Sequence, residues 1–250
     1  MELGLAGKGI VVTGASKGIG KAIALAFAEE GANLSICARG ELELINTQRE
    51  LSKLGVDVCA EICDVSNKES LQNFLEKSHQ SLGYIDVLVN NASRQLLGDD
   101  DSSWLANIEV DIMAITRAIK LVAPWMKKNG GSIINISSLA ALFAYPSPAY
   151  GATKAAMISL SRSYALSFAK DRIRVNVVAP GSTDFPGGYW DEIKQVNPES
   201  YKATASSIPT GRLNQANEIA DVVVFLASER AVRVTGTCLA VDGGQLLSIG

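Results

Sequence analysis

The chain has 250 residues, enough for one large domain or two small ones, and 47% of them are hydrophobic while 20% are charged. Its 23 basic and 26 acidic residues give a net charge of −3 with no basic run, which disfavours nucleic acid or an anionic membrane as a partner. Because no run of about 20 apolar residues and no leader-like N-terminus is present, we expect a cytoplasmic protein without a membrane span.

The first predicted strand, 9–14, leads through the glycine-rich stretch "TGASKGIG" directly into a predicted helix over 21–31. Gly14, Gly18 and Gly20 allow a sharp turn and let a pyrophosphate approach the free N–H groups at the start of that helix. Glycines alone would indicate only a turn. Their position between a strand and a helix favours a phosphate-binding loop for a dinucleotide.

The second predicted strand, 33–38, bears on the choice of dinucleotide. It ends in "CARG", where folds that bind NAD often place an acid against the ribose hydroxyl. Arg39 takes that place here, and together with Lys17 of the glycine loop it suits a 2′-phosphate. The sequence therefore favours NADP(H) over NAD(H), and the alternative is that Arg39 is an ordinary surface residue.

Strands and helices continue to alternate along the rest of the chain. We predict helices over 41–55, 66–82, 103–127, 149–169 and 217–228, and strands over 56–63, 85–90, 132–137, 172–179 and 237–241. Ser66 and Glu69 have the spacing of a capping box at the start of one of these helices. Seven strands alternating with six helices predict one α/β domain over 1–250, a Rossmann-like doubly wound parallel sheet with helices on both faces.

The helix over 103–127 carries an acid within an apolar stripe. Helical spacing places on one face Ile108, Asp111, Ile112, Ile115, Ile119 and Val122. An unpaired carboxylate facing a core is costly to bury. The sequence therefore raises the question of which partner or task Asp111 has.

The stretch "YGATK" opens the helix over 149–169 and puts Tyr150 and Lys154 four residues apart, on one face. A phenol has a pKa of about 10, and a neighbouring ammonium lowers such a pKa, which makes the phenol a better acid–base catalyst. Ser137 and Ser138 end the preceding strand, where a hydroxyl would hold a carbonyl oxygen beside the phenol. This spacing alone is weak and occurs by chance.

Between 181 and 210 the sequence is rich in glycine and proline and holds the aromatic residues Phe185, Tyr189, Trp190 and Tyr201. It follows the carboxyl end of a predicted strand, where open α/β sheets bind ligands. We expect a long irregular substrate loop with affinity for a substrate that has apolar surface. The alternative is a surface excursion that its aromatic residues anchor.

The cysteines and the single histidine do not predict a metal site. The four cysteines lie in apolar, strand-like stretches, and the Cys59–Cys63 spacing lacks the second ligand pair of a zinc site. His79 has no neighbours of ligand type along the chain. We expect buried free thiols in a reducing compartment and a partly exposed, structural His79.

Taken together, the motifs resemble those of the short-chain dehydrogenase/reductase family over essentially the whole chain. They are "TGASKGIG" (13–20), "CDV" (63–65), "NNA" (90–92), "NISS" (135–138), "YGATK" (150–154), "NVVAPG" (176–181) and "VDGG" (241–244). The resemblance implies a homotetrameric, nicotinamide-dependent enzyme that interconverts a carbonyl and a secondary alcohol on a small molecule.

The resemblance also implies roles for individual residues. Tyr150 would be the acid–base and Lys154 would favour its phenolate and bind the nicotinamide ribose. The catalytic serine would be Ser138, although its spacing to the tyrosine leaves Ser137 open. The cofactor would contact Gly14, Ser16, Lys17, Gly18, Ile19, Gly20, Arg39, Asp64, Val65, Asn91, Ala92, Tyr150, Lys154, Pro180, Gly181 and Thr183.

Two positions depart from the family pattern. Phe185 stands where the family often has threonine, so that a hydrogen bond to the carboxamide would fall to Thr183 or be absent. Asp111 stands where the family has a catalytic asparagine. One hypothesis is that Asp111 keeps a water relay to Lys154 while its charge disfavours the phenolate. In another it is a bystander satisfied by backbone or water, and if it blocks proton transfer the protein is a cofactor-binding sensor or scaffold.

Overall fold

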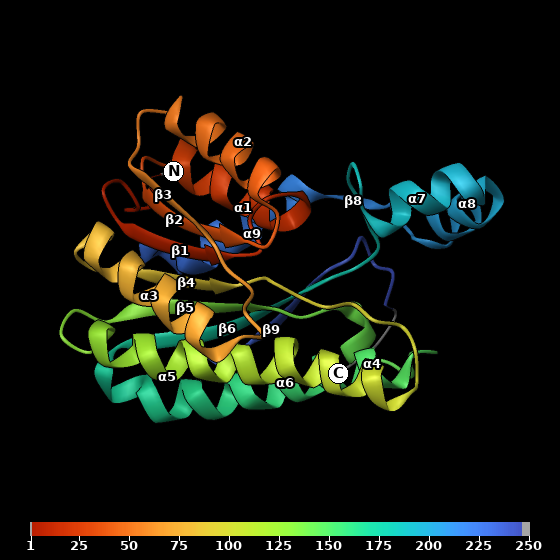
Figure 1. Ribbon diagram of the computed structural model, residues 1–250. Helices are drawn as coiled ribbons and strands as arrows, with labels where there is room; N and C mark the ends of the chain where they lie inside the picture. Colours follow the sequence, from red (N-terminus) through yellow and green to blue (C-terminus); the bar gives the residue numbers. More distant parts are fainter. Residues whose placement is uncertain (1, 247–250) are drawn as a thin grey trace.

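The computed structural model describes residues 2–246 and confirms the predicted α/β architecture (Figure 1). Within these residues the main sheet has seven parallel strands in the order β3-β2-β1-β4-β5-β6-β9. The order reverses between β1 and β4, and the carboxyl ends on either side of such a point form a ligand crevice. The strands are β1 (Gly9–Thr13), β2 (Asn33–Ala38), β3 (Val58–Ile62), β4 (Val87–Asn90), β5 (Gly131–Ile136), β6 (Ile173–Pro180) and β9 (Cys238–Val241).

Helices cover both faces of this sheet. Side chains of α1, α2 and α9 belong to the apolar cluster on one face, and side chains of α3, α5 and α6 belong to the cluster on the other. In Figure 1, α1 and α2 lie above the strands, and α5 and α6 lie below them. In β1, Ile10 and Val12 pack into the apolar cluster on one face and Val11 into the cluster on the other, which explains why the strands are nearly continuous apolar runs. The helices are α1 (Gly18–Glu29), α2 (Glu41–Ser52), α3 (Lys68–Leu82), α5 (Ile115–Met126), α6 (Pro148–Phe168) and α9 (Ala216–Ala227).

The helix predicted over 103–127 is interrupted. It consists of α4 (Asp101–Ile108), a π-helical turn η1 (Glu109–Ala114) and then α5. A π turn contains one extra residue, so the residues before it are rotated about the axis relative to those after it. The predicted stripe is therefore wrong at Ile108, which is 37% exposed, whereas Asn107 is fully buried.

The segment predicted as a long irregular loop over 181–210 contains two helices, so that prediction is wrong. It holds the short strand β7 (Thr183–Asp184), α7 (Tyr189–Val196) and α8 (Pro198–Ser207), and β7 pairs with β8 (Asn214–Gln215). Asn197 caps α8, and Pro198 occupies its first position, where a missing N–H costs nothing. In Figure 1, α7 and α8 project from the body of the molecule.

Smaller expectations have mixed outcomes. The capping box at Ser66 is wrong, because the side chain of Asn67 caps α3 by accepting from Ser70 N at 2.9 Å. His79 is partly exposed, as predicted, and stacks on Trp125 with 4.6 Å between ring centroids. Cys37 and Cys63 are buried, and Cys59 and Cys238 are half-buried.

Within residues 2–246 no helix combines the length and apolar character needed to cross a bilayer. Short 3₁₀ turns are η2 (Leu139–Ala141), η3 (Ala169–Asp171) and η4 (Glu229–Ala231).

Candidate active site

A cleft of about 1400 Å³ lies at the carboxyl ends of the strands. It brings together most of the predicted site residues: Gly14, Ser16, Lys17, Ile19, Gly20, Arg39, Asp64, Val65, Asn91, Ala92, Ser138, Tyr150, Lys154, Pro180, Gly181 and Thr183. Two predicted residues do not line it. Gly18 lies against the ring of Phe185, and Asp111 is fully buried against Lys154.

The glycine loop is closely packed against the end of β4. A Cβ added at Gly20 would lie 2.2 Å from the carbonyl oxygen of Gly14, which leaves room for glycine only. The amide of Asn91 donates to the carbonyl oxygens of Thr13 and Gly14, at 2.9 and 3.0 Å. Since α1 begins at Gly18, its free N–H groups lie at this loop, and the loop fits a pyrophosphate.

Opposite charges meet where β2 and β3 end. The carboxylate of Asp64 accepts from the hydroxyl and N–H of Ser66 at 2.7 and 3.0 Å. The Ser66 hydroxyl contributes most to lowering the pKa of Asp64, and the charges of Arg39 and Arg94 add to it. Glu43 lines the same part of the cleft, an acid near the second strand that the sequence reading missed.

Tyr150 and Lys154 lie on α6, and Lys154 is held from three sides. Its Nζ donates to the carbonyl oxygen of Ile136 at 3.0 Å, lies 2.8 Å from Oδ1 of Asp111 and is 5.7 Å from the centre of the Tyr150 ring. Burial alone lowers the pKa of Lys154, but Asp111 and Tyr150 together outweigh it, so the pKa is raised. The ammonium is therefore retained beside the phenol.

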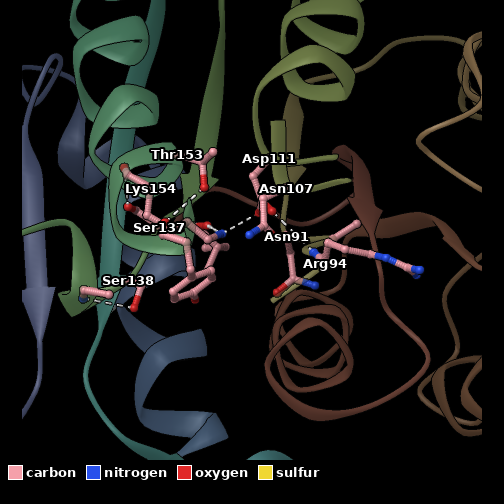
Figure 2. A network of polar contacts seen from close by, with 12 residues as sticks. Asn91, Arg94, Asn107, Asp111, Ser137, Ser138, Thr153 and Lys154 are labelled. Carbon is pink, nitrogen blue, oxygen red and sulfur yellow. Dashed lines mark hydrogen bonds and ion pairs between the residues drawn. The ribbon is translucent and has the colours of Figure 1, made fainter. Parts of the chain in front are cut away.

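The partner of Asp111 is thus Lys154 itself (Figure 2). Figure 2 shows Asp111 between Lys154 and Arg94, whose backbone N–H donates to Oδ2 over a long 3.4 Å. Asp111 lies in the π turn and is completely shielded from water. Asn107, one turn earlier, holds Leu96 through two hydrogen bonds, so this helix also fixes the segment after β4. A π turn at such a position is frequent in functional sites.

The two serines after β5 have different surroundings. The Ser137 hydroxyl is buried and donates to the carbonyl oxygen of Lys154 at 2.9 Å. The Ser138 hydroxyl accepts from the N–H of Ala140 at 3.1 Å, which leaves its own proton available to a ligand. This arrangement favours Ser138 over Ser137 as the donor to a carbonyl oxygen.

Comparison with known proteins agrees with this geometry. A family model described as enoyl-(acyl carrier protein) reductase matches residues 14–245. The 3-oxoacyl-(acyl-carrier-protein) reductase FabG of Thermotoga maritima is 35% identical over 97% of this chain and 99% of its own length. Glucose 1-dehydrogenase of Gluconobacter oxydans is 37% identical over 97% of this chain and 93% of its own length. The chain belongs to the short-chain dehydrogenase/reductase family.

Solved structures of this family have the same fold. L-Sorbose reductase from Gluconobacter frateurii, complexed with NADPH and L-sorbose, has a TM-score of 0.91 and 35% identity over 100% of both chains. A 7α-hydroxysteroid dehydrogenase, complexed with NADH and 7-oxo glycochenodeoxycholic acid, has a TM-score of 0.90 and 33% identity over 99% of this chain and 98% of its own. This short-chain dehydrogenase/reductase is therefore an NAD(P)-dependent oxidoreductase acting on CH–OH groups.

In this short-chain dehydrogenase/reductase, Phe185 packs against the glycine loop. Its ring lies between Gly18 and Gly188, since a Cβ added to either glycine would lie 2.6 Å from it. Nearby, Nζ of Lys17 donates to the carbonyl oxygen of Gly187 at 3.1 Å. The segment 185–188 therefore lies directly on the glycine loop, and one of the three donors of the Lys17 ammonium is used there.

Other residues of the cleft were missed by the sequence reading. Among them are three large apolar side chains outside the recognised motifs: Leu97, Leu105 and Phe143. In the sequence, Leu97 follows the "NNA" motif, Leu105 precedes Asp111 and Phe143 precedes Tyr150. Apolar side chains in segments that follow the carboxyl ends of strands are the signal that could have found Leu97 and Phe143.

Proposed function

We propose that this enzyme interconverts a carbonyl and a secondary alcohol with NADP(H), with Tyr150 as the acid–base. The observation that carries the proposal is the buried array of Tyr150, Lys154 and Asp111 on the same cleft as the glycine loop. A phenol that acts as the acid is helped by a positive charge that stabilises its phenolate and by a second donor that holds the carbonyl oxygen. Tyr150, Lys154 and Ser138 supply these groups.

The dinucleotide would lie along the cleft from Arg39 and Asp64 to Lys154. When bound, its nicotinamide supplies or accepts the hydride at the carbonyl carbon. During reduction Tyr150 gives its proton to the carbonyl oxygen, which Ser138 holds in place. Thr183 donates to the carbonyl oxygen of Gly181 at 2.9 Å, and its remaining lone pairs are available to a carboxamide N–H.

The proposed preference for NADP(H) rests on Arg39. We expect Arg39→Asp to weaken NADPH binding about 10- to 100-fold, because a charged hydrogen bond to phosphate is lost and a like charge is introduced. The affinity for NADH should change less than about threefold. Titration of the quenching of protein fluorescence by each nucleotide gives both dissociation constants.

Arg49, exposed on α2 and away from the cleft, offers a matched control. Arg49→Asp should leave both affinities unchanged. Equal losses for NADPH and NADH in Arg39→Asp would refute the 2′-phosphate role. Tighter binding of NADH than NADPH by the unmodified enzyme would instead assign the ribose hydroxyl to Glu43.

A cofactor-binding sensor or scaffold is the second candidate, and the direct ion pair of Asp111 with Lys154 is the observation that favours it. Loss of NADPH absorbance during incubation with ketones, acyl thioesters and ketoses separates the two. We expect turnover of at least one class at about 1 s⁻¹ or faster, a rate ordinary for enzymes. Tight NADPH binding without turnover of any class would favour the sensor.

Homotetrameric assembly and a cytoplasmic location remain predictions that rest on the family resemblance and on composition. Large apolar side chains exposed away from the cleft are compatible with subunit contacts, among them Leu166 on α6, which is 82% exposed. Sedimentation of the purified protein measures the assembly, and fractionation of the source cells measures the location.

A further inference from the structure

Exposed apolar side chains gather in the cleft that holds Tyr150. Leu97, Leu105, Phe143 and Tyr189 line it although they are 39%, 68%, 46% and 43% exposed. They come from four separate segments: the loop after β4, helix α4, the loop before α6, and α7. Single exposed apolar residues are ordinary, but a group that converges from four segments marks a ligand site.

Two rows of aromatic rings meet in this part of the cleft. Phe143, Tyr145 and Tyr150 are arranged edge to face, with 5.7 and 6.0 Å between successive ring centroids. Tyr189 and Trp190 form a second such pair at 5.3 Å on α7. All five of these rings line the same cleft. A substrate whose apolar part is bound along Phe143 and Tyr145 would place its carbonyl group at the phenol of Tyr150.

Three of the polar side chains that line the cleft are already bonded within the protein. The hydroxyl of Ser102 donates to Asp100, and that of Ser207 donates to the carbonyl oxygen of Thr204. Glu109 is paired with Arg117. These three groups therefore have fewer hydrogen-bonding sites left for the hydroxyls of a sugar, and polar groups buried without a partner are costly.

We infer that the substrate carries its carbonyl or alcohol on a large apolar ring system, as in a fused-ring or aryl ketone, rather than on a sugar chain. The inference rests on the proposed carbonyl/alcohol activity and names its substrate class. Aromatic walls bury flat apolar rings with a favourable edge or face contact in addition to the area removed from water. Leu97, Leu105, Phe143 and Tyr189 are then specificity-determining residues.

The test compares kcat/KM for 2-decalone, cyclohexanone and L-sorbose with NADPH. Decalone carries about four more CH₂ groups than cyclohexanone, and each buried group is worth about 0.8 kcal/mol, so we expect at least a tenfold higher kcat/KM. Phe143→Ser should lower kcat/KM for 2-decalone about tenfold more than it lowers kcat/KM for cyclohexanone, so that most of that advantage is lost. Leu42→Ser is the matched control, because Leu42 is 69% exposed on α2 and outside the cleft.

Failure of the inference differs from failure of the proposed function. If L-sorbose exceeds decalone, the substrate class is wrong while carbonyl reduction stands. If no carbonyl is reduced, the proposed function fails, but binding of decalone still tests the apolar subsite. Saturable quenching of Trp190 fluorescence by decalone supports that subsite. The quenching should be absent in Trp190→Phe, and Phe143→Ser should weaken the binding about tenfold. If decalone does not bind to the NADP⁺-loaded protein, the inferred apolar subsite is wrong.

Discussion

Replacing Tyr150 with phenylalanine should lower kcat by about 10²- to 10⁴-fold, the usual contribution of a positioned general acid. Only the hydroxyl is removed, and the ring that packs near Tyr145 and Lys154 remains. We therefore expect NADPH to bind within about threefold of its original affinity. Steady-state reduction of a ketone measures the first quantity, and nucleotide titration by fluorescence measures the second.

The chain supplies a control on the same helix. Tyr164 lies on α6 and stacks on Phe168, outside the cleft. Tyr164→Phe removes an equivalent hydroxyl and should leave kcat unchanged. If Tyr150→Phe turned over substrate at the original rate, Tyr150 would not be the acid–base, and the proposed role of Lys154 would fall with it.

Much of the fold could be predicted because its signals are local. A strand of a parallel sheet is buried on both faces, so β1, β4 and β6 are nearly continuous apolar runs that need no knowledge of their neighbours. The glycine loop is likewise readable, since Gly14 needs a positive φ of 68° and Gly20 has no room for a Cβ. Tyr150 and Lys154 meet because one helix carries both.

The remaining features depend on tertiary contacts. The π turn at Asp111 has no residue pattern of its own, and the ion pair joins two helices that are distant in the sequence. The helices within 181–210 are hard to distinguish from an irregular loop in the sequence, because Asn197 and Pro198 are typical of turns as well as of helix starts. The apolar cleft wall was missed because Leu105 and Phe143 come together only in the folded chain.

Replacing Asp111 with asparagine should shift the pH dependence of the rate to lower pH by about one unit, which corresponds to about 1.4 kcal/mol. The carboxylate lies 2.8 Å from Nζ of Lys154, and its negative charge disfavours a second anion at Tyr150. Without that charge, the negative charge that develops on the Tyr150 oxygen during the reaction meets less repulsion. Ketone reduction should then decline, and alcohol oxidation should rise, at a lower pH than in the original enzyme.

The pH profile of kcat for both directions provides this measurement, and a distant ion pair controls for general changes in charge. Asp171 lies 3.5 Å from Lys127 in a partly exposed pair, and Asp171→Asn should leave the profile unchanged. An unshifted profile in Asp111→Asn would make Asp111 a structural bystander. A shift to higher pH would mean that Lys154 had lost its proton when its partner was removed.

Stability provides a second readout of the same pair. Asp111→Ala leaves the Lys154 ammonium buried without its counter-charge and should lower the free energy of unfolding at neutral pH by about 3–5 kcal/mol. The pKa of Lys154 is raised above its ordinary value of 10.5, so the stabilisation is fully present below about pH 10.5 and is lost as pH rises through the folded-state value. In the variant the unpaired, buried ammonium loses its proton more easily, so the gap between the original and variant proteins in urea denaturation should be largest near pH 7 and should narrow as the pH rises toward 10.5. A gap that does not change between pH 7 and pH 10.5 would show that the loss of stability does not come from the Lys154 charge, and the buried ion pair would then not be what holds Asp111 in place.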